Sequence, residues 1–94
     1  MDIARNIAAL REEDLKRINA MGRTGENALI IYEGLFDKPT ISIEETSAKL
    51  DISVATSGRL LDRLCEEGIL SNLDNRKRKK VFVYKRYIDA FNKD

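Results

Sequence analysis

The feature that most constrains the fold is a three-residue junction, Asp51-Ile52-Ser53, between two segments with helical patterns. Aspartate tolerates the left-handed backbone conformation that a tight turn between helices needs, and Ser53 can cap the helix that follows. That helix is expected over 54–67, where small or apolar residues recur at the i, i+3, i+4, i+7 spacing of one buried face. These residues are Ser57, Leu60, Leu61 and Leu64. Two helices joined this closely must cross at a steep angle, so the junction predicts a helix-turn-helix.

Three helices are expected before the junction. Apolar residues recur at helical spacing over 3–21 with charged residues between them, which is typical of an amphipathic helix. Thr24 can cap a second helix over 25–36, whose wide apolar face suits burial from two sides. The third, a short helix over 43–50, begins with the capping-box pattern of a serine followed three residues later by a glutamate.

A β-hairpin is expected near 70–84. The segment 81–84, Val-Phe-Val-Tyr, is β-branched or aromatic throughout, and Asp74-Asn75 supplies turn chemistry. The segment 40–42 is long enough only to add an edge strand to a sheet formed elsewhere. The hairpin connection contains five adjacent cations whose mutual repulsion forces the tip into solvent. They are Arg76, Lys77, Arg78, Lys79 and Lys80.

These elements predict a mainly α fold with a small β-hairpin, an α+β arrangement. Helix, helix, short strand, helix-turn-helix and basic-tipped hairpin is the order of a winged helix domain, which the chain resembles over 24–84. We divide the chain into an amphipathic linker or partner helix at 1–22 and a winged helix-turn-helix domain at 23–94. The apolar stripe of 3–21 is expected to lie outside the core and to contact a partner. The predicted core is Leu29, Ile31, Leu35, Leu50, Ile52, Leu60, Leu61, Leu64, Leu70, Val81 and Val83.

Composition excludes several classes of site. The chain has no histidine and one cysteine, so a Cys/His zinc site, a disulfide framework and a histidine-dependent triad are impossible. It also lacks a phosphate-cradling glycine loop, and we expect no enzyme activity, no metal and no cofactor. The longest apolar run has five residues, and no basic stretch leads into an apolar block at the N-terminus. A cytoplasmic chain without membrane contact is expected.

Several stretches are similar to the C-terminal winged helix of Fic family proteins, the adenylyltransferases named for filamentation induced by cAMP. They are Ile41-Ser42-Ile43, Ser53-Val54-Ala55-Thr56, L-L-D-R-L-C-E-E-G-I-L at 60–70, R-K-R-K-K-V-F-V-Y-K-R-Y-I at 76–88 and L-R-E-E-D-L-K-R-I-N-A-M-G-R at 10–23. The family's H-P-F-x-x-G-N-G-R signature is absent. The resemblance therefore implies either a non-catalytic, regulatory C-terminal part of such a protein, with an adjacent Fic catalytic domain as a partner, or a stand-alone relative without catalytic activity.

Charge patterning suggests two functions. The net charge of +1 is the sum of −3 over residues 1–47 and +4 over residues 48–94. Two halves of opposite charge indicate a charged face on the folded protein. In the first reading the chain binds duplex DNA through the helix 54–67 and the wing cations 76–80. The residues expected to bind DNA are Arg59, Arg63, Arg76, Lys77, Arg78, Lys79 and Lys80.

The reading face expected on that helix is poor in side chains that recognise bases. It consists of Val54, Ala55, Gly58, Arg59 and Asp62. Only Arg59 can make a bidentate guanine contact, and Asp62 repels phosphates unless it accepts from a cytosine amine. The second function, kept open by this face and by the low net charge, is a protein–protein interaction or dimerisation module. Such a module positions a neighbouring domain or a second copy through residues 3–21, without binding nucleic acid.

Overall fold

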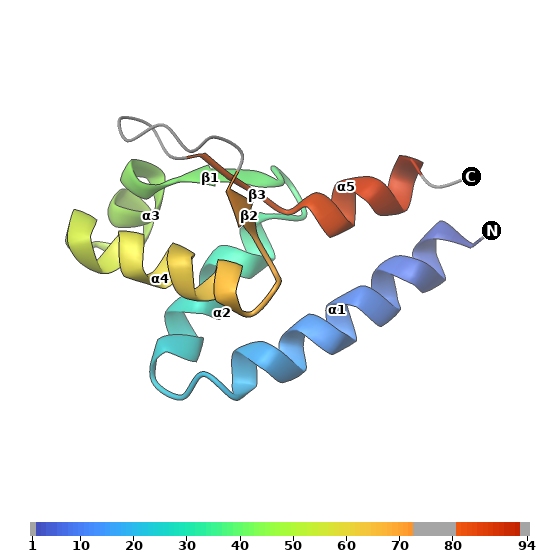
Figure 1. Ribbon diagram of the computed structural model, residues 1–94, viewed down its shortest axis with the longest axis horizontal. Helices are drawn as coiled ribbons and strands as arrows, with labels where there is room; N and C mark the ends of the chain where they lie inside the picture. The colour runs from blue at the N-terminus through green and yellow to red at the C-terminus, as the bar shows by residue number, and fades with distance from the viewer. Residues whose placement is uncertain (1, 73–80, 93–94) are drawn as a thin grey trace.

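The computed structural model describes residues 2–72 and 81–92, and within these ranges it forms the winged helix fold expected from the sequence (Figure 1). The expected tip of the hairpin, with the cations at 76–80, lies outside the described residues. The elements in chain order are α1 (Ile3–Asn19), α2 (Thr24–Gly34), β1 (Thr40–Ser42), α3 (Ile43–Leu50), α4 (Val54–Glu66), β2 (Ser71–Asn72), β3 (Val81–Val83) and α5 (Lys85–Asn92).

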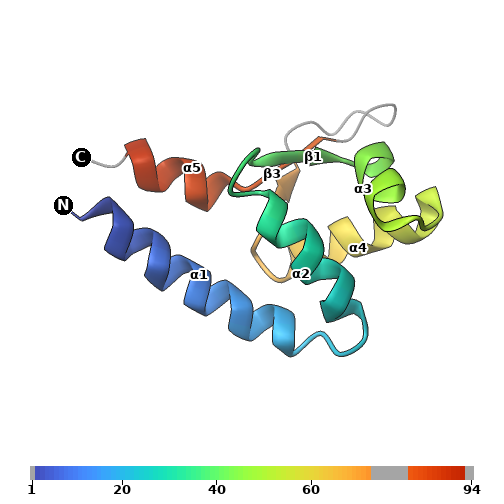
Figure 2. The same cartoon turned by 180° about the vertical axis from the view of Figure 1, so that it is seen from behind.

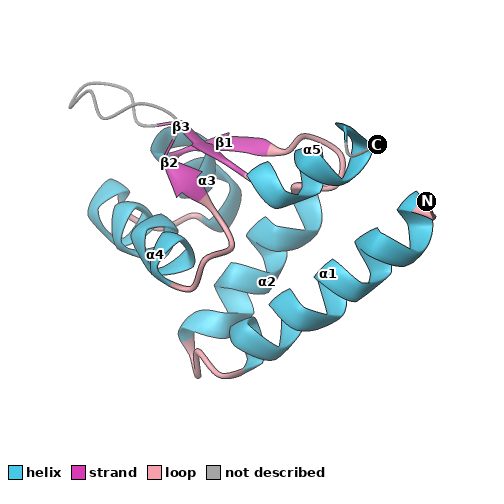
Figure 3. Ribbon diagram, turned by 45° about the vertical axis from the view of Figure 1, so that its right-hand side comes forward, coloured by secondary structure: helices cyan, strands magenta, loops and turns pink. Residues whose placement is uncertain are grey.

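The described strands form a small antiparallel sheet in the order β1-β3-β2, at one edge of a mainly helical molecule (Figure 3). β1 pairs with β3 at the edge of the sheet, as expected, with Ile41 opposite Phe82. β2 is shorter than expected. Ile69 and Leu70 are buried, but their amides donate to the carbonyl of Leu64, so they close the end of α4 and do not pair with β3.

The core contains seven of the eleven predicted residues and three large aromatic ones that were not predicted. Seven predicted residues are buried, and four are only half-buried, namely Leu29, Leu50, Ile52 and Val81. Leu29 and Leu50 pack against the edge of the core cluster. The largest fully buried side chains include Tyr32, Phe82 and Tyr84. A tyrosine can occupy a core only where its hydroxyl finds a partner, and the sequence pattern did not identify one.

α1 corrects the expectation that 3–21 lies outside the core. Ile18 is 1% exposed and Met21 is 7% exposed, and both belong to the main hydrophobic cluster. Helical periodicity shows that the apolar stripe of a helix must be covered, but it does not show which element covers it. In this fold α1 packs against α2 and α5. Seen from the front and from behind, the start of α1 and the end of α5 lie together at the end of the molecule opposite the α3–α4 turn (Figures 1 and 2).

α5 is an eight-residue helix that follows the sheet almost directly. Its Ala90 is 9% exposed, while Phe91 is 52% exposed beside the C-terminus. None of the helices in the described part of the chain combines the length and the apolar character that a bilayer span requires.

Candidate nucleic-acid interface

The turn between α3 and α4 is built by the residues that the sequence indicated. Asp51 adopts the left-handed conformation, with φ 54° and ψ 50°, and ends α3. Ser53 caps α4, because its hydroxyl accepts a hydrogen bond of 3.1 Å from the amide of Thr56. The turn fixes the direction in which α4 leaves α3, and thereby decides which of its faces is exposed.

The buried face of α4 is the predicted one. Ser57, Leu60, Leu61 and Leu64 are each less than 5% exposed. The Ser57 hydroxyl donates to the carbonyl of Ser53 at 2.8 Å, so this small polar residue fits against α3 without leaving an unsatisfied group. The opposite face, with Val54, Ala55, Thr56, Arg59 and Asp62, is exposed. Gly58 is half-buried instead of exposed, since a Cβ there would lie 3.6 Å from Cδ1 of Ile43.

A groove of about 750 Å³ runs between the exposed side of α4 and the first turn of α2. It is lined from α2 and the residue before it by Arg23, Thr24 and Asn27, from the turn by Ile52, and from α4 by Thr56, Arg59, Leu60, Asp62, Arg63 and Glu66. Three arginines against two carboxylates give the lining a net charge of +1. The groove is therefore mildly positive and lies beside the helix that the sequence assigns to base contacts.

The two predicted cations of α4 are placed differently. Arg59 is exposed, and its Nε donates only a long bond of 3.4 Å to the carbonyl of Ala55. Arg63 is half-buried, and its Nε lies 3.0 Å from a carboxylate oxygen of Glu67 one turn later. Arg59 can thus reach a ligand at little cost, whereas Arg63 would first have to give up an ion pair. The other five predicted site residues, 76–80, lie outside the described residues.

Arg23 is a candidate that sequence reasoning missed. The sequence suggested that Thr24 caps the second helix, but the helix begins at Thr24, and Arg23 occupies the capping position without a side-chain hydrogen bond there. Arg23 is exposed and shares the groove with Arg59. Arg23 and Arg59 are far apart in the chain, so nothing in the sequence indicated that they share a groove. The one available signal for Arg23 was its place as a cation at the start of the helix before the helix-turn-helix.

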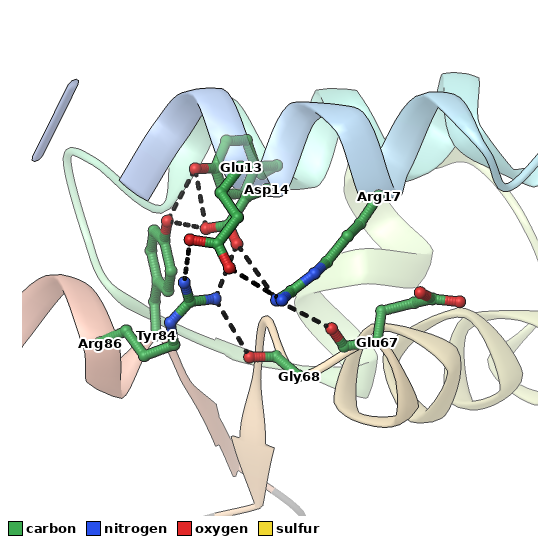
Figure 4. Close-up of polar contacts among 8 residues, drawn as sticks. Glu13, Asp14, Arg17, Glu67, Gly68, Tyr84 and Arg86 are labelled. Carbon is green, nitrogen blue, oxygen red and sulfur yellow. Dashed lines mark hydrogen bonds and ion pairs between the residues drawn. The ribbon is translucent and has the colours of Figure 1, made fainter. Parts of the chain in front are cut away.

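A second cluster of charged residues lies at the C-terminal end of α4 and was also missed. We call it the Asp14 cluster, which comprises Glu13, Asp14, Arg17, Tyr32, Tyr84 and Arg86 (Figure 4). Asp14 is fully buried in α1, and its Oδ1 accepts a 2.7 Å bond from Arg86 of α5. Its Oδ2 accepts from the hydroxyl of Tyr84, while the Tyr32 hydroxyl lies 3.1 Å from the same oxygen.

The pKa values of the two tyrosines of the cluster lie above the usual range of a phenol. Burial raises the pKa of the Tyr84 phenol, and the bond that it donates to Asp14 raises it further. Burial also raises the pKa of Tyr32, whose hydroxyl lies 2.7 Å from that of Tyr84. The sequence carried one signal for this cluster, because Asp14 lies four residues after Leu10 and four before Ile18 on the apolar stripe of α1.

Comparison with known proteins identifies the fold and corrects the resemblance drawn from the sequence. The chain is similar to the solved structure of a MarR family protein from Bacillus stearothermophilus, with a TM-score of 0.50 and 17% sequence identity over 96% of this chain and 67% of the other. No family model and no curated protein matches the chain.

The Fic assignment was therefore wrong, because the structural neighbour belongs to another family and nothing in these comparisons supports a Fic domain. The stretch 60–70, one of those on which the resemblance rested, has a general structural explanation. It supplies buried leucines, the left-handed Gly68 and the buried pair Ile69 and Leu70, which together end α4 and begin the wing. The chain therefore has the winged helix fold.

Proposed function

We propose that this chain is a DNA-binding regulatory module, not an enzyme, and that α4 enters the major groove of duplex DNA. The observation that carries the proposal is the shared groove of Arg59 and Arg23 along the exposed face of α4. In the described part of the chain neither side chain forms an ion pair, so both charges are available to DNA. A major groove about 12 Å wide admits one helix.

The chemistry of this face favours binding with little sequence preference. Arg59 is the only residue on it that can make a bidentate contact to guanine, and Asp62 disfavours a close phosphate. Phosphate contacts by Arg23 and by the wing cations 76–80 would then supply most of the affinity, because each contact releases condensed counterions. We expect dissociation constants of about 10⁻⁴–10⁻⁶ M, the range of non-specific binding.

The test is a fluorescence-anisotropy titration of a mixed-sequence duplex at several salt concentrations between about 50 and 200 mM. With about four phosphate contacts the slope of log affinity against log salt should be near −4. Arg23→Ala should make the slope less negative by about 0.9, and the triple alanine variant of Lys77, Arg78 and Lys79 by up to about 3. Arg59→Ala should do the same as Arg23→Ala for a phosphate contact, or cost about 1–3 kcal/mol for a guanine contact.

Arg5→Ala is the matched control for charge. Arg5 is 85% exposed and lies near the N-terminus of α1, at the end of the molecule away from α4 (Figure 1). Its loss removes one positive charge but should leave affinity and slope unchanged. Equal effects of Arg5→Ala and Arg59→Ala would show that net charge alone drives binding, and no binding at about 50 mM salt, where screening is weak, would reject the DNA interface.

A second candidate function is favoured by the end of the molecule that carries both chain ends. Ile3 of α1 is 38% exposed and Phe91 of α5 is 52% exposed, and large apolar side chains at that exposure suit a contact with a partner. The occupant that we propose is a second copy of the chain, joined through the first turn of α1, where Ile3 is exposed although the rest of the stripe packs within the fold. Such a dimer is compatible with DNA binding, because α4 lies at the other end (Figure 2).

A further inference from the structure

The turn that joins α4 to β2 is held by two arginines from the terminal helices. Nη1 of Arg17 in α1 donates to the carbonyl of Glu67 at 3.3 Å, and Nη1 of Arg86 in α5 donates to the carbonyl of Gly68 at 3.4 Å (Figure 4). Glu67 is the C-terminal cap of α4, and Gly68 follows it with φ +80°. Both contacts therefore fall where the recognition helix ends and the wing begins.

Backbone hydrogen bonds in this turn couple the end of α4 to the start of the wing. The amide of Gly68 donates to Cys65, and the amides of Ile69 and Leu70 both donate to the carbonyl of Leu64, at 3.0 and 3.2 Å. These bonds tie the first residues of the wing to the last turn of α4. A displacement of the Glu67 and Gly68 carbonyls must then move the end of the helix and the start of the wing together.

The two arginines are themselves fixed by a pair of adjacent carboxylates. Arg86 lies 2.7 Å from Asp14 and 3.5 Å from Glu13, and Arg17 lies 2.9 Å from Glu13 and 3.9 Å from Asp14. Asp14 is also bound by Tyr84, the residue that directly follows β3. The Asp14 cluster thus joins α1, α5 and the end of the sheet to one turn, and the planar guanidinium fork is the group suited to bridge several acceptors at once.

We infer that Arg17 and Arg86 are positioning residues, which set the end of α4 and the start of the wing relative to the terminal helices. The inference extends the proposed function, on which its effect on DNA affinity rests. Neither arginine lines the groove beside α4. They act through the turn, so that a change in the Asp14 cluster alters DNA binding without touching the DNA.

The experiment compares Arg17→Lys and Arg86→Lys with Arg11→Lys. Each variant keeps its positive charge and loses the guanidinium fork. Arg11 is the matched control because it also lies on α1 and makes tertiary contacts, an ion pair of 3.7 Å to Glu33 and a stacking contact over Phe36, but it does not touch the turn. Two quantities are measured on the full chain, namely DNA affinity with its salt slope, and amide hydrogen exchange at Gly68, Ile69 and Leu70.

We expect Arg17→Lys and Arg86→Lys to weaken DNA binding by about 2- to 30-fold, the usual range for residues that couple a distant region to a site. The salt slope should stay unchanged, because no phosphate contact is lost, and the three turn amides should exchange faster. Arg11→Lys should change neither quantity. Glu13→Gln serves as a mild second variant, because loss of the exposed Glu13 carboxylate loosens both arginines without leaving a buried charge unpaired. This variant should also raise the rate of amide hydrogen exchange at the turn.

The outcomes separate this inference from the proposed function. If both lysine variants keep wild-type affinity, or if Arg11→Lys weakens binding as much, the positioning role is wrong. If Arg17→Ala or Arg86→Ala makes the slope of log affinity against log salt less negative by about 0.9, that arginine contacts a phosphate directly. If the wild-type chain does not bind DNA, the proposed function fails, and the exchange data still decide whether the arginines hold the turn. Unchanged exchange in all variants would overturn the inference.

Discussion

Replacing Asp14 with alanine should destabilise the protein by about 3 kcal/mol or more. The carboxylate is fully buried and receives bonds from Tyr84 and Arg86, with Tyr32 beside them. Breaking a buried ion pair by removing one partner typically costs about 3–5 kcal/mol, because the other charge is left without compensation. Since the side chain of Arg86 is 34% exposed and still lies 3.5 Å from Glu13, part of that charge stays compensated and the lower end of the range applies.

The tyrosine hydroxyls add to the cost only in part. They lie 2.7 Å apart and can still bond to each other, so the variant leaves one buried acceptor or donor unsatisfied at most. Against a total stability of about 5–14 kcal/mol for 94 residues, a loss of 3 kcal/mol is large. Alanine is a good helix former, so the loss cannot be assigned to the helical propensity of α1.

The assay is urea unfolding followed by far-ultraviolet circular dichroism at pH 7, with Glu13→Ala as the control. Glu13 precedes Asp14 and contacts the same two arginines, but its side chain is 54% exposed, so its loss should cost no more than about 1 kcal/mol. With a urea slope of about 1.5 kcal/mol/M, Asp14→Ala should lower the midpoint by about 2 M. Equal midpoints for the two variants would refute the argument that burial makes this carboxylate important.

Three further predictions concern the core, the tyrosines and the exposed end. Leu64→Ala removes a fully buried side chain and should cost about 2–5 kcal/mol in the same assay, whereas a cost below about half a kcal/mol would mean that Leu64 is not buried in solution. Because the pKa values of Tyr32 and Tyr84 are raised on folding, stability should be fully present below about pH 10 and fall above it by up to about 1.4 kcal/mol per pH unit for each tyrosine. Tyr32→Phe should roughly halve the loss of unfolding free energy in urea melts between pH 9 and 11. An unchanged loss would show that the raised pKa of Tyr32 does not contribute to it. If a second copy covers the exposed end, replacing Ile3 and Phe91 by serine should convert a dimer into a monomer in light scattering, and a wild-type chain that is monomeric at every concentration would contradict it.

The helix-turn-helix was predictable because local rules decide it. The capping box is present as expected, with the Ser42 hydroxyl accepting from the amide of Glu45 and the Glu45 carboxylate accepting from the amide of Ser42, both at 3.1 Å. The left-handed Asp51, the cap at Ser53 and the buried stripe of α4 likewise depend on residues within one or two turns of each other. Capping, turn chemistry and helical spacing are all visible in a short window of sequence.

The Asp14 cluster and the groove at Arg23 were not predictable because their partners are distant in the chain. Arg86 lies 72 positions after Asp14, and nothing in the spacing of either residue names the other. A buried carboxylate on an apolar stripe signals that a partner is needed but does not identify it. The same limit explains why residues 3–21 were assigned to a separate partner surface, although Ile18 of α1 and Met21 just after the helix pack into the core.

The most direct test of DNA binding through α4 is a titration of ¹⁵N-labelled protein with a mixed-sequence duplex at low salt, followed by amide chemical shifts. If α4 enters the major groove, the largest shifts should lie along its exposed face from Val54 to Asp62, at the start of α2 around Arg23 and in the wing cations 76–80, with little change near Ile3. Shifts confined to the end of the molecule that carries Ile3 and Phe91, or no shifts at all, would contradict it.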